Sequence, residues 1–66
     1  MRDPKRLNTI YIELMEIHKS KAPDIRFGQL MCGFTHWLDT KYKKDIFYVG
    51  DDQILKLMKE YLRVEE

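Results

Sequence analysis

The sequence predicts a small all-α domain of three helices, with a short extended or β segment at about residues 46–49 before the last helix. Two observations predict this fold class. Apolar residues recur at helical spacing in three stretches of the chain, as they do in amphipathic helices. The apolar fraction of 44% and the charged fraction of 35% are those of a folded, helix-rich protein rather than a disordered one. With 66 residues, the chain is expected to form one domain over residues 1–66.

The first helix is predicted at about residues 4–19. Asp3 is expected as its N-cap and Pro4 as its first residue, because both residue types favour a helix start. One face then carries Leu7, Ile10, Tyr11, Leu14, Ile17 and His18. Pro23 disfavours helical geometry at the residue before it and is expected to end the helix. We interpret His18 as a histidine at the edge of the core with a hydrogen-bonded ring nitrogen, in preference to a pH switch.

The second helix follows Asp24, which is a candidate cap. Its apolar positions share one helical face: Phe27, Leu30, Met31, Phe34 and Leu38. Gly28 and Gly33 each weaken a helix by up to about 1 kcal/mol relative to alanine, but the regular apolar spacing outweighs them. The polar stretch from Asp39 to Asp45 is predicted to be a solvated loop.

The third helix is expected to begin at Gly50-Asp51-Asp52, with one aspartate as N-cap and the other favoured by the positive helix terminus. Its apolar face comprises Ile54, Leu55, Met58, Tyr61 and Leu62. Ahead of it, residues 46–49 are β-branched or aromatic. This composition is typical of either a short strand or an extended segment packed over the helices.

Composition excludes several classes of function. A net charge of +1 supplies no overall field that would attract nucleic acid or an anionic membrane. No apolar run approaches 18 residues and no signal peptide is evident, so we expect a cytoplasmic protein with no membrane contact. One cysteine excludes an internal disulfide, and with two histidines it cannot complete a conventional four-ligand zinc site. We therefore expect no metal and no cofactor.

Two small groups of residues have the right chemistry for catalysis or metal binding, but both have simpler interpretations. Cys32 and His36 are neighbours on the second helix, on the side opposite its apolar stripe. We interpret them as an exposed pair rather than as a nucleophile and base, because catalysis needs a cleft that excludes water. Asp51 and Asp52 are explained by their place at a helix start. The chain is therefore expected not to be an enzyme.

The apolar faces of the first and third helices are wider than three short helices can bury against one another. Such a surplus indicates contact with a second copy of the chain, with a larger protein, or with both. Trp37 lies on the flank of the second helix, where Gly33 would let another backbone approach. The expected interface residues are Leu30, Gly33, Trp37, Phe47 and Tyr48. The alternative for Trp37 is that it widens the core face of its own chain.

One basic run suggests a different function. Lys41, Lys43 and Lys44, together with Arg26, are the residues that would contact phosphates if the protein were a small nucleic-acid-binding accessory protein. We rank this alternative below protein binding, because these residues are more simply explained as a solvated loop.

Short blocks along nearly the whole chain are similar to a known family. They are Lys5-Arg6-Leu7-Asn8 in the first helix, Pro23-Asp24-Ile25, Gln29-Leu30, and Asp51-Asp52 before the last helix. With these blocks the chain resembles the YihD-like family of small bacterial and phage proteins, whose function is uncharacterised. The resemblance implies a small helical domain of bacterial or phage origin and no particular activity. We therefore expect a non-enzymatic protein-binding module, a homodimeric regulator or phage-type inhibitor of a larger bacterial protein.

Overall fold

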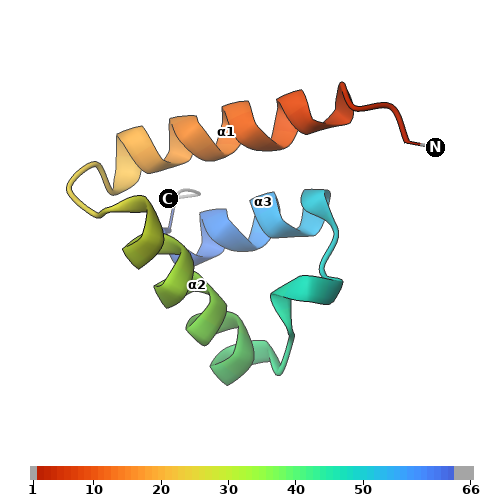
Figure 1. Ribbon diagram of the computed structural model, residues 1–66. Coiled ribbons are helices and arrows are strands. Elements are labelled where there is room, and N and C mark those ends of the chain that lie inside the picture. The colour runs from red at the N-terminus through yellow and green to blue at the C-terminus, as the bar shows by residue number, and fades with distance from the viewer. Residues whose placement is uncertain (1, 64–66) are drawn as a thin grey trace.

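The computed structural model describes residues 2–63, and these form three α-helices and one 3₁₀ turn with no strand among them. The elements follow the order α1 (Arg6–Lys21), α2 (Phe27–Tyr42), η1 (Ile46–Tyr48) and α3 (Asp51–Tyr61) (Figure 1). The predicted small all-α domain of three helices is thus confirmed. No helix within residues 2–63 is long and apolar enough to cross a bilayer.

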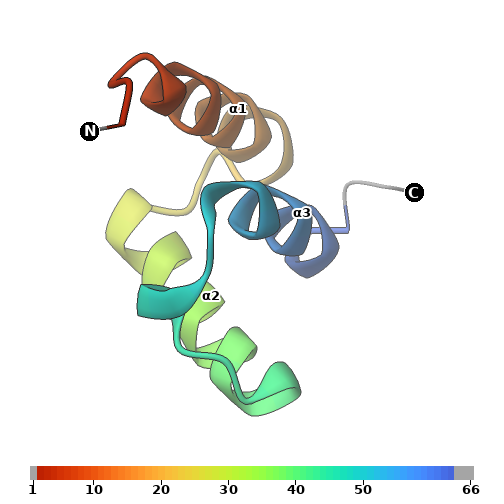
Figure 2. The same cartoon turned by 90° about the vertical axis from the view of Figure 1, so that its right-hand side faces the viewer.

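The last helix occupies the middle of the molecule. α3 lies between α1 and α2 and packs against both (Figures 1 and 2). All three helices contribute to the core, which consists of Ile17, Leu30, Phe34, Leu38, Leu55, Leu57 and Met58. The stripe predicted for the second helix is therefore correct at Leu30, Phe34 and Leu38, whereas Phe27 is exposed at the start of that helix.

The first helix is displaced by two residues at each end from the predicted 4–19. Asp3 lies ahead of the helix, where its carboxylate accepts from the backbone N–H of Lys5 at 3.0 Å. The Arg6 N–H donates to the Asp3 carbonyl at 3.1 Å, so a tight turn precedes the first α-helical residue. At the other end the helix reaches Lys21, the last position before Pro23 restricts the backbone of Ala22.

The second helix begins later and ends later than predicted. Its N-cap is Arg26, not Asp24, and the Gln29 side chain accepts from the Arg26 N–H at 3.0 Å. Residues 39–42, predicted as loop, are helical. The helix ends at Tyr42, and its C-cap Lys43 is left-handed (φ 58°) and donates its N–H to the Asp39 carbonyl at 3.0 Å. This is the conformation that commonly closes a helix, here adopted without glycine.

Residues 46–49 form neither a strand nor an extended arm. The Asp45 side chain accepts from the Phe47 N–H at 3.0 Å and its carbonyl accepts from the Tyr48 N–H at 2.9 Å, so the chain winds into a 3₁₀ turn. The third helix then starts from Gly50 as its N-cap. Asp51 and Asp52 both lie in the first turn, and neither is the cap.

Candidate protein-binding surface

The most exposed aromatic side chains belong to η1. Phe47 is 79% exposed and Tyr48 is 81% exposed, and their rings meet edge to face with centroids 4.9 Å apart. We call these two residues the η1 aromatic pair. Both were expected at an interface, and the structure leaves both open to a partner.

The sequence around the η1 aromatic pair explains why it projects outward. A 3₁₀ turn has three residues per turn, so residues three apart share one side. Ile46 and Val49 are three apart, and both are half-buried against the core. They anchor the turn, and the Asp45 carboxylate caps it. The two aromatic residues between the anchors must therefore point away from the core.

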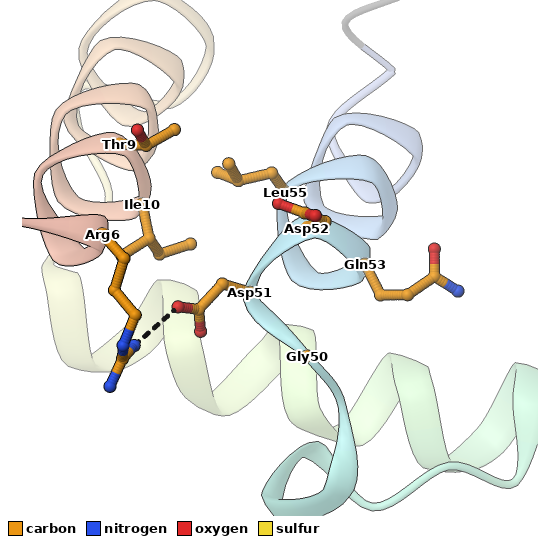
Figure 3. Close-up of a pocket in the computed structure, with 8 residues that line it drawn as sticks. All are labelled: Arg6, Thr9, Ile10, Gly50, Asp51, Asp52, Gln53 and Leu55. Carbon is orange, nitrogen blue, oxygen red and sulfur yellow. Dashed lines mark hydrogen bonds and ion pairs between the residues drawn. The ribbon is translucent and has the colours of Figure 1, made fainter. Parts of the chain in front are cut away.

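One hollow adjoins η1, and a second lies next to the first. The first, of about 550 Å³, is lined on one side by Arg2 and Arg6 and on the other by Phe47 and Tyr48. The second, of about 450 Å³, separates the starts of α1 and α3. In Figure 3 the side chain of Arg6 reaches across to Asp51, with Nη1 3.3 Å from Oδ2. This ion pair forms a wall shared by the two hollows.

The second hollow is lined by two aspartates, Asp51 and Asp52. Asp51 is paired with Arg6, and Asp52 lies in the first turn of α3, where the helix dipole favours a carboxylate. No group of three or more His, Cys, Asp or Glu side chains within residues 2–63 is placed to hold a metal ion. The walls of the hollow are thus partly polar and partly apolar.

The other three predicted interface residues take part in packing within the chain. Leu30 is 1% exposed and belongs to the core, so no partner can reach it in this conformation. Gly33 faces Tyr61, and a Cβ at Gly33 would lie 2.5 Å from the Tyr61 hydroxyl oxygen. The close approach expected at this glycine is thus made by the chain's own α3. Leu30 was also predicted on the apolar stripe of the second helix, and that prediction is the correct one. The contact between Gly33 and Tyr61 was missed, because the sequence does not show where α3 packs.

Trp37 is half-buried within an aromatic cluster. Its ring centroid lies 5.3 Å from that of Tyr61, 5.6 Å from that of Tyr42 and 6.0 Å from that of Phe34. The Lys41 ammonium lies 5.4 Å from the indole centroid, a favourable position for a cation. These contacts agree with the alternative that Trp37 widens the core face of its own chain. A role of Trp37 at an interface stays a prediction. The η1 aromatic pair and the Trp37 cluster are two separate groups of rings.

Beside the Trp37 cluster, Glu60 joins the end of α3 to the end of α2. Its carboxylate accepts from Lys41 Nζ at 2.8 Å and from the Tyr42 hydroxyl at 2.6 Å. The hydrogen bond from Lys41, followed by that from Tyr42, lowers the pKa of Glu60. The same bonds raise the pKa of Lys41 and of Tyr42. Lys41 is therefore engaged within the chain.

The four basic residues considered for phosphate contacts lie at two opposite ends of α2. Arg26 precedes α2 and Lys43 follows it, so the 16 residues of the helix separate them by roughly 24 Å at the usual rise per residue. Lys43 and Lys44 are exposed. The structure does not bring the four basic residues together.

The remaining sequence candidates are surface or edge positions. Cys32 and His36 are both exposed on α2. His18 is half-buried, and its Nε2 lies 2.6 Å from the Ile25 carbonyl oxygen. The interpretation of His18 as a core-edge histidine with a hydrogen-bonded ring nitrogen is confirmed.

A feature that sequence reasoning did not assign as a site is an apolar groove of about 370 Å³ between α1 and the start of α2. It is lined by Tyr11, Leu14, Met15, His18 and Phe27. The wide apolar face of the first helix was the available signal. The spacing of Phe27 matches the apolar stripe of α2, so the sequence predicted it in the core. It lies one turn before the first buried residue of that stripe, Leu30, and is exposed.

Comparisons of the chain with protein-family models, with curated proteins and with solved structures gave no match.

Proposed function

We propose that this chain is a non-enzymatic protein-binding module, a cytoplasmic homodimeric regulator or phage-type inhibitor of a larger bacterial protein. The observation that carries the proposal is the exposure of two adjacent aromatic residues, Phe47 and Tyr48, on a turn whose other residues are anchored. The bacterial or phage setting comes from the resemblance to the YihD-like family.

Aromatic side chains account for much of the binding energy at protein interfaces. In water, an isolated turn would leave two such rings free to reorient, and binding would have to order them. Here the Asp45 cap and the half-buried Ile46 and Val49 fix the backbone before a partner arrives. The turn is therefore already ordered in the folded chain, and binding does not have to supply the conformational entropy that ordering it would cost. This favours tight binding through a small contact.

The partner's chemistry is suggested by the hollow beside the η1 aromatic pair. Arg2 and Arg6 line it together with the two rings, while Asp51 contributes the one acidic side chain. Arginine and aromatic residues are both enriched at interface centres. A protein segment that inserts an apolar side chain and presents a carboxylate nearby would fit these walls.

The test uses the full chain with a photo-reactive benzoylphenylalanine in place of Tyr48, irradiated in a bacterial lysate. Any protein cross-linked there is then purified, and its affinity for the wild-type chain is measured by calorimetry. Phe47→Ser should weaken that affinity by about 30-fold, the equivalent of the roughly 2 kcal/mol typical of an interface anchor. Circular dichroism should show unchanged helix content, because the Phe47 ring is solvated.

Ile25→Ser is the matched control, since it removes an exposed apolar side chain from the turn between α1 and α2. It should bind the partner as the wild type does. If Phe47→Ser binds as tightly as the wild type, the η1 aromatic pair is not the binding surface and the proposal fails.

A further inference from the structure

We infer that the apolar groove between α1 and the start of α2 is the contact between two copies of this chain. The inference rests on the proposed function and deepens it, because it separates self-association from partner binding. The groove would form the dimer, and the η1 aromatic pair would remain free for the larger protein.

The groove exposes large side chains from two helices. Tyr11 is 66% exposed, Phe27 is 58% exposed and Met15 is 49% exposed, and all three line one hollow. Ile12, which neighbours Tyr11 on α1, is exposed as well. Isolated surface apolar residues are ordinary, but a contiguous apolar surface with a polar surround is typical of an interaction site.

The area of the chain supports a second copy as the occupant. Its accessible surface is 5332 Å², whereas a compact monomer of 8.1 kDa exposes roughly 4500 Å². The surplus of roughly 800 Å² is about what one partner contributes to a standard protein interface. The radius of gyration agrees, since it is 12.0 Å against about 10.8 Å for a typical domain of this length.

Charge also favours a second copy. A two-fold contact brings residues near the axis close to their own symmetry mates, so a charged group there would meet a like charge. None of the five residues that line the groove is an Asp, Glu, Lys or Arg. Two titratable rings line it, Tyr11 and His18, and the Nε2 of His18 lies 2.6 Å from the Ile25 carbonyl oxygen. The surface can therefore meet itself without repulsion.

Sedimentation equilibrium between 1 and 100 µM (on the order of typical dimer dissociation constants) tests the inference. The wild type should sediment at twice 8.1 kDa, about 16 kDa, at the upper concentrations. Met15→Glu should raise the dissociation constant by at least about 30-fold, because two like charges would be brought together in the groove. Thr40→Glu adds the same charge at an exposed site on the far end of α2 and should leave the dissociation constant unchanged.

A second measurement places the contact without relying on a charge. In a Cys32→Ser background, Met15→Cys, whose side chain lines the groove, should form disulfide-linked dimers under mild oxidation, whereas Thr40→Cys should not. A wild type that sediments at 8.1 kDa throughout, or a Met15→Glu variant that stays dimeric, would overturn the inference. A monomeric wild type would also remove the homodimer from the proposed function. Binding of a larger protein through the η1 aromatic pair would still stand or fall separately, by the effect of Phe47→Ser.

Discussion

α1 and α3 carry equally wide apolar faces, yet they use them differently. α1 has 16 residues and gives one of them, Ile17, to the buried core. α3 has 11 residues and gives three, Leu55, Leu57 and Met58. α1 lies on the outside of the molecule and meets the core along one side, whereas α3 is covered by α1 on one side and α2 on the other (Figure 2).

The difference shows that the width of an apolar face, read from the sequence, does not tell how much of it is buried. The position of the helix in the fold determines which of its apolar residues are covered. The predicted surplus on the third helix is wrong, because packing between two helices leaves Ile54, Tyr61 and Leu62 half-buried against the core. The predicted surplus on the first helix is present, at Tyr11, Ile12 and Met15.

The largest difference in stability is expected between two methionine substitutions, one in α3 and one in α1. Met58 in α3 is fully buried and Met15 in α1 is half-exposed. Met58→Ala should cost about 2–5 kcal/mol of unfolding free energy, because it removes buried groups and leaves a cavity. Met15→Ala should change it by no more than about 0.5 kcal/mol. Urea denaturation followed by circular dichroism measures both.

The two variants should be compared at several protein concentrations. Self-association stabilises the folded state by mass action, so any loss from Met15→Ala that grows with concentration reports the dimer rather than the monomer. Equal losses for both variants at low concentration would contradict the assignment of α1 to the outside of the molecule.

A smaller effect is expected at Gly33, where α3 approaches α2 most closely. In Gly33→Ala the new Cβ would lie 2.5 Å from the Tyr61 hydroxyl oxygen, so the ring must shift away from Trp37. Overpacking of this kind costs about 1–3 kcal/mol, while the gain in helix propensity is up to about 1 kcal/mol. We expect a net loss of about 1 kcal/mol in thermal or urea unfolding.

Two further variants isolate the cause of that loss. In a Tyr61→Phe background the nearest remaining atom, Cζ, is an ordinary 3.7 Å away, so Gly33→Ala should become stabilising. Gly28→Ala meets no atom within 4 Å and should also stabilise, by up to about 1 kcal/mol. Should Gly33→Ala destabilise equally in both backgrounds, the close approach of Tyr61 is not its cause.

The smallest effect is a pH dependence at the end of α3. Because the pKa of Glu60 is lowered by its hydrogen bonds, its stabilisation is present above the usual value of 4.5 and disappears as the pH falls below it. The pKa values of Lys41 and Tyr42 are raised from 10.5 and 10.0, so their stabilisation is present below these values and disappears at higher pH. The cluster therefore stabilises the fold between about pH 5 and pH 10.

Glu60→Gln is the variant to compare with the wild type across this range. The stability difference between them should be largest near neutral pH and should narrow at both extremes. It should also shrink with added salt, because the groups are solvated. A difference that stays constant from pH 3 to pH 11 (roughly the span of these usual pKa values) would show that the hydrogen bonds contribute nothing measurable.

Much of the fold could be predicted from the sequence, because the helical periodicity at Leu30, Phe34 and Leu38 specifies a core face without further information. The helix boundaries could not. Asp24 has the chemistry of a cap, yet the side chain that closes the start of α2 is Gln29, acting from within the helix. Residues 39–42 are polar and appeared to be loop, but contact of Tyr42 with Trp37 and Glu60 keeps them helical.

The candidate site was predictable only in part. Phe47 and Tyr48 are aromatic residues in a short segment between helices, and exposure follows once the turn is anchored at Ile46 and Val49. In the sequence, the large Trp37 lies one helical turn after the small Gly33, and this pairing suggested a contact with another chain. Their partner is Tyr61, which lies 24 positions after Trp37 and 28 after Gly33. Helical periodicity contains no information on contacts at such a separation.

The central position of α3 has a consequence for how the protein is made. Both helix pairs with extensive contact include α3, and α3 follows α1 and α2 along the chain. While a ribosome still holds α3, α1 and α2 have no common core to close upon. Folding must then wait until α3 has left the ribosome, after which the small size and mostly local contacts favour rapid completion. A chain terminated ahead of Asp51 would keep two of its three helices and, lacking the element that joins them, would be a substrate for proteolysis.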